Sequence, residues 1–143
     1  MIAVDTNILV YAYHSEAPQH ATARAALKEL AEGSVAWGIP VFAIGEFLRV
    51  VTHRLGPLRR PVNGAEAMRA IDVLVESPSA RVLLPGRRFL PLLRDLILGG
   101  RVRGDLVFDA QIVAVCLEHG ATTILTEDRD FRRFSGITVE GIG

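Results

Sequence analysis

Short apolar runs that alternate with helical patterns constrain the fold of this 143-residue chain most strongly. The spacing of apolar residues predicts strands at 2–4, 34–37, 81–84, 122–125 and 137–140, and helices at 7–13, 18–30, 40–52, 64–75, 88–98, 106–119 and 128–134. Parallel strands need a long crossover between them, usually a helix. The order therefore predicts the α/β class, with a mostly parallel sheet that helices cover on both faces.

Size and composition predict one domain that spans residues 1–143. Half of the residues are hydrophobic and 22% are charged, which excludes extended disorder. No apolar run reaches the roughly 18–20 residues that span a bilayer, and the N-terminus lacks the basic segment of a signal peptide. We therefore expect a cytoplasmic protein that does not bind membranes. Cys116 is the single cysteine, so no internal disulfide forms, and we expect an inert thiol in a helix core.

The charges balance, with 16 basic and 16 acidic residues, which argues against a protein that coats nucleic acid by bulk electrostatics. All basic residues except Lys28 are arginines, and several stand in pairs, such as Arg101 and Arg103. Arginine suits phosphate oxygens, because its planar fork donates two hydrogen bonds at once. The same pairs also fit a solvated surface, and the sequence leaves both interpretations open.

Four carboxylates interrupt apolar segments, where a charge is costly unless it is paired or binds a cation. Asp5 follows the first apolar run, Glu46 lies among the apolar residues of the helix at 40–52, Asp109 opens an apolar helix, and Asp128 follows the run that ends at Leu125. In parallel sheets the ligand crevice lies beyond the carboxyl ends of the strands, which is where Asp5 and Asp128 fall. The four positions together indicate a site for a divalent cation.

Each of these acids also has a purely structural interpretation. These interpretations are a helix cap at Asp5, Asp105 or Asp128, a salt bridge between Glu46 and Arg49, and a solvated Asp130. Taken together they explain the set poorly, because clustered carboxylates repel one another unless a cation is present. Ligation by oxygen alone favours Mg²⁺ or Mn²⁺ over zinc. The four histidines show no zinc-ligand spacing.

The ordered set of motifs resembles the PIN domain, and specifically the VapC-type ribonuclease toxins. The matching pieces are Val4-Asp5-Thr6-Asn7, then Glu46, then Asp109-Ala110, and finally Thr126-Glu127-Asp128-Arg129-Asp130-Phe131. The resemblance implies an α/β/α sandwich of three layers, and a metal-dependent endoribonuclease that is the toxin of a toxin–antitoxin pair. It also implies a homodimer and a VapB-type antitoxin whose C-terminal segment fills the groove.

The resemblance assigns roles to particular residues. The catalytic acids it implies are Asp5, Glu46, Asp109 and Asp128, which also hold Mg²⁺ or Mn²⁺ together with Asp105. Thr6, Asn7 and Thr126 match positions that orient the carboxylates or the attacking water. Arg101 and Arg103 precede Asp105 in a glycine-rich loop, so we expect them to hold the RNA backbone. An Asp5→Asn variant is expected to lose cleavage and keep its fold, whereas loss of folding would make Asp5 a structural cap.

Two other functions compete with this interpretation. A phosphoryl-transfer domain also places an aspartate after its first strand, but a receiver domain needs a late lysine, whereas the only lysine here is Lys28. A dehalogenase-like domain needs Asp-x-Asp, and this chain has Asp5-Thr6-Asn7. The second competitor is a PIN-like module that binds RNA or a protein without catalysis. Metal-dependent turnover separates that module from a nuclease.

Overall fold

Five short parallel strands form one sheet at the centre of the computed structural model, which describes residues 1–143. The strands are β1 (Ile2–Val4), β2 (Trp37–Pro40), β3 (Ala80–Leu83), β4 (Thr123–Leu125) and β5 (Thr138–Glu140), and their order across the sheet is β3-β2-β1-β4-β5. All four strand pairs are parallel, so the predicted mostly parallel sheet is confirmed. β1 and β4, which are distant in the sequence, are neighbours at its middle.

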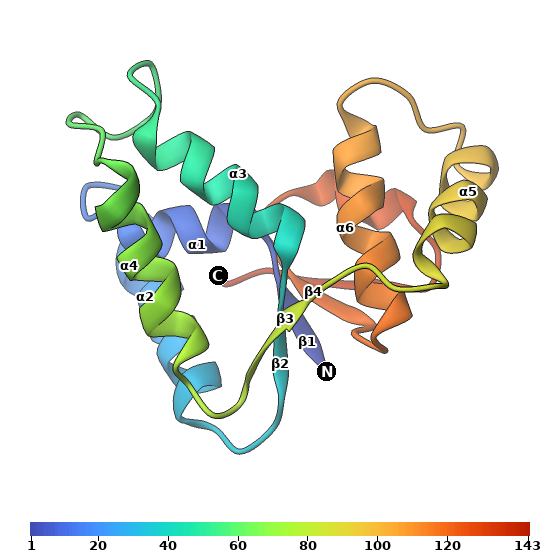
Figure 1. Ribbon diagram of the computed structural model, residues 1–143, viewed down its shortest axis with the longest axis horizontal. Coiled ribbons are helices and arrows are strands. Elements are labelled where there is room, and N and C mark those ends of the chain that lie inside the picture. Colours follow the sequence, from blue (N-terminus) through green and yellow to red (C-terminus); the bar gives the residue numbers. More distant parts are fainter.

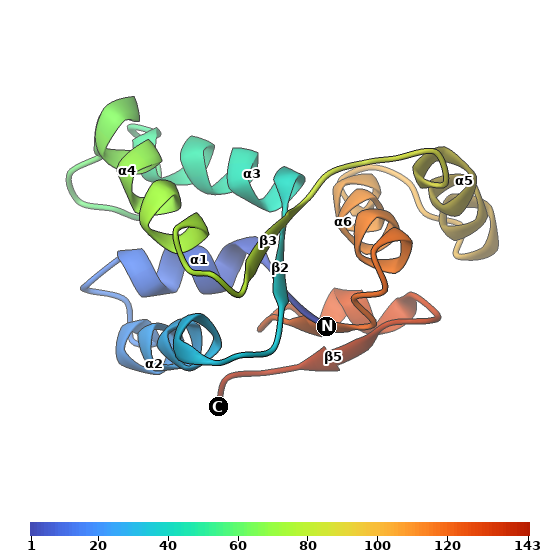
Figure 2. The same ribbon diagram turned by 60° about the horizontal axis from the view of Figure 1, so that its bottom comes forward.

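Helices cover both faces of this sheet, which confirms the three-layer arrangement. One face carries α1 (Thr6–Tyr13), α2 (His20–Glu32), α3 (Val41–Thr52) and α4 (Gly64–Val75). The other carries α5 (Phe89–Gly99), α6 (Leu106–Glu118) and the 3₁₀ turn η1 (Arg129–Arg133). Figures 1 and 2 show the two groups of helices on opposite sides of the strands. No helix is both long and apolar enough to cross a membrane.

The alternation of side chains along β1 and β4 divides the core into two halves. Ala3 pairs with Ile124, and both pack toward α5 and α6, whereas Val4 pairs with Leu125, and both pack toward α1 to α4. Cys116 lies in the half formed by α5 and α6, where burial raises the pKa of its thiol to about 12. The expected core position of this free cysteine is confirmed, and its raised pKa is typical of an inert thiol.

Three local predictions from the sequence were wrong. The second strand lies at Trp37–Pro40 instead of 34–37, and all four of its residues are buried. Gly38 is needed in this strand, because a Cβ atom there would lie 2.7 Å from Leu83 Cδ1. The predicted helix at 128–134 is the shorter 3₁₀ turn η1. The helix predicted at 18–30 is present, but both of its bounds were wrong by two residues: it spans His20–Glu32, where Ala23 and Leu27 are the buried residues. The remaining boundaries differ from the structure by one residue at most.

Candidate functional site

Asp5 lies where β1 ends and α1 begins, and its side chain is only 5% exposed. One carboxylate oxygen, Oδ1, accepts a hydrogen bond from the Thr6 backbone N–H at 2.7 Å, which caps α1. The other oxygen, Oδ2, accepts from the Thr126 hydroxyl at 2.7 Å. Asp5 is therefore a helix cap, as one interpretation of the sequence expected. The charges of Glu46 and Asp128 also act on it and raise its pKa, so its role in a cation site stays a prediction.

The hydroxyl of Thr126 connects the ends of β1 and β4. This side chain is 1% exposed, and its oxygen donates to Asp5 and accepts from Asn7 Nδ2 and from the Asp128 backbone N–H, both at 3.0 Å. A further hydrogen bond joins the Thr6 hydroxyl to Glu46 Oε2 at 3.3 Å. Thr6 and Thr126 thus contact acids of the candidate site directly, and Asn7 contacts Thr126, an arrangement compatible with the orienting role that the family resemblance implies.

A Thr126→Val variant tests this connection. Valine has nearly the same shape but leaves three buried or half-buried partners without a hydrogen bond, so we expect the free energy of unfolding to fall by about 1–3 kcal/mol. Denaturant unfolding measures the change. Thr126→Ser keeps the hydroxyl and is expected to retain most of the stability. Equal losses in both variants would show that packing of the methyl group matters, and not the hydroxyl.

Three carboxylates come closest together at the ends of these strands. Oxygen atoms of Asp109, Asp128 and Asp130 all lie within 4.8 Å of one another. Asp128 Oδ1 also accepts from the Asp130 backbone N–H at 2.9 Å, so Asp128 caps η1 as one interpretation of the sequence expected. Asp130 is exposed, as expected for a solvated residue, but it belongs to the closest group of acids. Three carboxylates at this separation suit an oxygen-binding divalent cation.

Two of the acids, Asp5 and Asp109, have raised pKa values. Burial first, and then the charges of Asp128, Asp5, Glu46 and Asp130, raise the pKa of Asp109 from 3.8 to about 7. Burial is also the largest cause that raises the pKa of Asp5, to about 6, although its hydrogen bonds with Thr126 and Thr6 act in the opposite direction. A bound divalent cation would reverse this repulsion, because it favours the ionised carboxylates.

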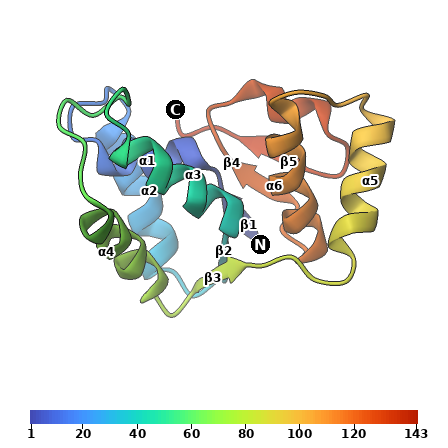
Figure 3. The same cartoon turned by 45° about the horizontal axis from the view of Figure 1, so that its top comes forward.

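All of these acids except Asp5 line a groove of about 890 Å³ between α3 and α6. Figure 3 views the molecule with these two helices facing the reader, over the strands. The α3 wall includes Glu46 and Arg49, and the α6 wall includes Asp105, Phe108 and Asp109. Asp128 and Asp130 complete the acidic part of the lining.

Two structural interpretations of the acids were wrong. Glu46 is exposed on the groove wall and forms no salt bridge with Arg49, since the one salt bridge in the chain joins Lys28 to Glu32 at 3.9 Å. Asp105 occupies the N-cap position of α6, but its side chain makes no capping hydrogen bond. It is an exposed residue of the groove instead.

The structure places two residues at the groove that the sequence interpretation did not assign to the site, and it leaves two predicted RNA-binding arginines outside the groove lining. Arg49 lines the groove three residues after Glu46. Residues at this spacing lie on the same side of a helix, so the sequence could have indicated that Arg49 accompanies Glu46. Asp130 follows Asp128 by two residues, and only the tight η1 turn brings their carboxylates together. Arg101 and Arg103 are exposed in the loop before α6, outside the groove lining, so their binding of RNA stays a prediction.

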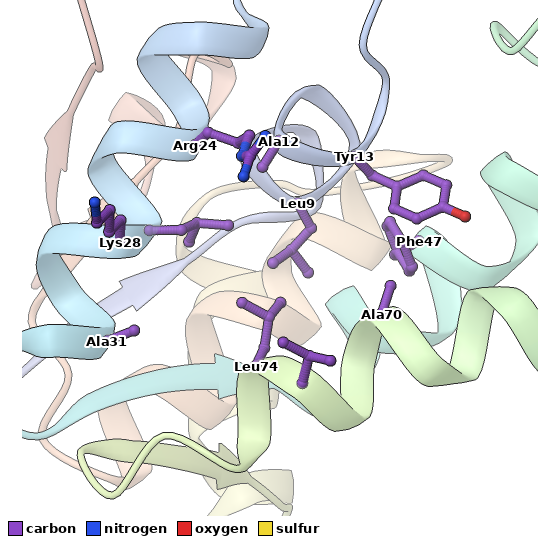
Figure 4. A pocket seen from close by; sticks show the side chains of 11 residues that line it. Leu9, Ala12, Tyr13, Arg24, Lys28, Ala31, Phe47, Ala70 and Leu74 are labelled. Atoms are coloured by element: carbon purple, nitrogen blue, oxygen red, sulfur yellow. The ribbon is translucent and has the colours of Figure 1, made fainter.

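A second groove, of about 400 Å³, is different in character. Figure 4 shows it among α1, α2, α3 and α4, with Leu9, Tyr13, Phe47 and Leu74 among its side chains. Nine of its 11 lining residues are hydrophobic, and none carries a carboxylate. It therefore does not contribute to the acidic site.

A sequence profile of the PIN domain matches residues 2–137, which include all of these acids. The chain belongs to the PIN-domain family. Among curated relatives, ribonuclease VapC43 of Mycobacterium tuberculosis is 37% identical over 134 residues, which cover 94% of this chain and 90% of the relative. Ribonuclease VapC48 of the same organism is 34% identical over 139 residues and covers 94% and 92%. These relatives place this PIN domain among the VapC ribonucleases.

Solved structures confirm the fold of this PIN domain. A VapBC2 complex from Rickettsia felis, bound to a DNA fragment from its promoter, superimposes with a TM-score of 0.72 at 17% identity, covering 99% of this chain and 98% of that one. VapC20 of M. tuberculosis, a toxin that cleaves the sarcin–ricin loop, gives a TM-score of 0.68 at 19% identity, covering 96% and 99%. Membership of this family leaves no support for a receiver or dehalogenase-like domain.

Proposed function

We propose that this PIN domain is the toxin of a VapBC-type pair and hydrolyses phosphodiester bonds of RNA as a metal-dependent endoribonuclease. One observation carries the proposal: carboxylate oxygens of Asp109, Asp128 and Asp130 lie within 4.8 Å of one another, and all three residues line an open groove. The relatives that cover most of the chain are VapC ribonucleases, which supports the same reaction here.

The donor set fits Mg²⁺ or Mn²⁺, because every candidate ligand is a carboxylate oxygen. Asp109, Asp128 and Asp130 would hold the ion, and Asp5, Glu46 and Asp105 complete the acidic set around it. Such an ion, when bound, lowers the pKa of water and offsets negative charge on the phosphate. The raised pKa of Asp109, to about 7, supports this assignment, because part of the rise comes from repulsion by neighbouring carboxylates, which a bound cation would relieve.

The side chains of the groove divide the remaining work. Glu46, exposed on the α3 wall, accepts a proton from the attacking water as a new bond forms between water oxygen and phosphorus. One phosphorus–oxygen bond to ribose breaks, the departing oxygen takes up a proton from solvent, and Glu46 then releases its proton to solvent. Asp5 is held by Thr126 and by the backbone of Thr6, so its carboxylate stays fixed beside the reacting groups.

Cleavage of total cellular RNA by the purified, antitoxin-free protein tests the proposal. We expect discrete fragments with Mg²⁺ or Mn²⁺ and none with EDTA, because without a cation the acids repel each other and the substrate phosphate. Mapping the fragment ends identifies the target. No cleavage by metal-loaded protein would favour the non-catalytic module, and cleavage that persists in EDTA would contradict the metal-dependent mechanism.

The partners are part of the same proposal. The structures that share this fold include VapBC2 of R. felis and FitAB bound to a DNA fragment, which support a small VapB-type antitoxin as the partner of this chain. Co-expression with a small gene encoded beside this one, followed by affinity purification, tests the pairing. The homodimer also stays a prediction, which sedimentation of the free protein would check.

A further inference from the structure

Phe108 is an aromatic residue in an unusual place. Its ring is 59% exposed, and it lines the acidic groove on the first turn of α6, immediately before Asp109. Phe42, which also lines the groove, has a partner inside the protein, since its ring stacks on Phe89 with centroids 5.6 Å apart. Phe108 forms no such aromatic pair. An unpaired ring in a polar groove is suited to a flat ligand.

Arg49 is the one cationic side chain among the residues that line this groove. It is exposed on the α3 wall and forms no salt bridge, so its guanidinium is available to a ligand. The other charged residues of the lining are acids. Because an arginine fork matches the oxygens of a phosphate, a phosphate group is the ligand that this position suits best.

We propose that Phe108 and Arg49 form the two sides of a nucleotide subsite, in which an unpaired base stacks on the Phe108 ring and Arg49 binds the backbone phosphate. The subsite rests on the proposed ribonuclease function and specifies its substrate. A base inside a duplex is already stacked on its neighbours and presents no free face, whereas a base in a single strand or loop does. The groove therefore selects unpaired RNA next to the acids.

Fluorescence of a Phe108→Trp variant tests the stacking directly. The native Trp37 is fully buried, and its indole N–H donates a hydrogen bond to Ser79. The added indole is therefore the fluorophore that solvent and ligands can reach. Leu90→Trp is the matched control, because Leu90 is also 59% exposed but lies at the start of α5, outside the groove lining. With Ca²⁺ in place of Mg²⁺ to limit cleavage, a single-stranded RNA oligonucleotide should quench only the Phe108→Trp emission, and a duplex of equal length should not.

The phosphate contact has its own measurement. Arg49→Gln should weaken binding of the oligonucleotide and reduce the slope of log affinity against log salt by about 0.7, the value for one phosphate on a single strand. Arg94→Gln, on the exposed side of α5, is the control and should leave the slope unchanged. An unchanged slope in Arg49→Gln would remove the residue from the subsite.

Cleavage assays separate the subsite from the ribonuclease function itself. With the acids intact, Phe108→Ala should lower kcat/KM on single-stranded RNA by about 5- to 150-fold, and Phe108→Tyr should retain it. If Phe108→Ala cleaved RNA at the wild-type rate and RNA did not quench Phe108→Trp, the subsite would be overturned and the ribonuclease function would stand. Quenching without wild-type cleavage would keep the subsite and refute the nuclease. If the emission of Phe108→Trp changed with protein concentration and not with added RNA, Phe108 would be a contact between two copies of the protein, and the subsite would be overturned.

Discussion

An Asp109→Asn variant is expected to lose RNA cleavage by about a thousandfold, because a metal site typically supplies several kcal/mol of transition-state stabilisation. The same variant should melt at a higher temperature than the wild type in EDTA at pH 8. Burial and four neighbouring acids raise the pKa of Asp109 to about 7, so removal of its charge relieves repulsion in the folded protein. Cleavage assays and thermal melts measure the two effects.

Asp72→Asn is the matched control for this variant. Asp72 is an exposed aspartate on α4, outside the groove, so its substitution should change neither cleavage nor the melting temperature. If Asp109→Asn cleaved RNA at the wild-type rate, Asp109 would have no part in metal binding. If it lost cleavage but melted at a lower temperature in EDTA, its effect would come from a disrupted fold.

Metal affinity is expected to rise about tenfold between pH 6 and pH 8 through Asp109 alone. A carboxylate with a pKa of about 7 is mostly protonated at pH 6, and a cation must displace that proton before it binds. Asp5, with a pKa of about 6, adds to the dependence at the acidic end. Titration calorimetry with Mn²⁺ at several pH values measures the affinity. The Asp109→Asn variant should bind more weakly and with a shallower pH dependence. An affinity that does not change across this range would contradict the raised pKa values.

The metal-free protein should show the opposite trend in stability. Because the folded pKa values of Asp5 and Asp109 lie above the ordinary value of 3.8, the folded state binds more protons than the unfolded state between about pH 4 and 7. Their contribution is therefore most favourable below that window and is lost as the pH rises through it. Excess Mg²⁺ or Mn²⁺ should restore the stability above pH 7.

The sequence predicted the fold well because its strands are short, apolar and separated by helices. The strand order followed from none of these patterns, since nothing local to Ile2–Val4 indicates that Thr123–Leu125 is its neighbour. The misplaced second strand has a similar cause. Val35 and Ala36 extend the apolar run toward the N-terminus, whereas the residues that the sheet buries begin at Trp37.

The candidate site was predictable where an acid was out of place in an apolar segment. Asp5 and Asp109 gave that signal and lie together with Asp128 as expected. Glu46 gave the same signal, but its side chain is exposed because the helix turns that position toward the groove. Asp130 stands in ordinary polar surroundings in the sequence, and Arg49 was interpreted as a salt-bridge partner of Glu46; only the folding of η1 and α3 brings them to the site.

The pairing of β1 with β4 also determines when the protein becomes active during its synthesis. Asp5 and Thr126 are separated by 121 residues in the sequence, yet they share the hydrogen bond that fixes the site. A ribosome adds roughly 5–20 residues per second, so Thr126 is synthesised several seconds after Asp5. Until β4 and η1 have emerged, the growing chain lacks Asp128 and Asp130 and holds no complete acidic site. A chain that ends before Asp128 therefore cannot assemble the group of three carboxylates, however well its first strand and helix have formed.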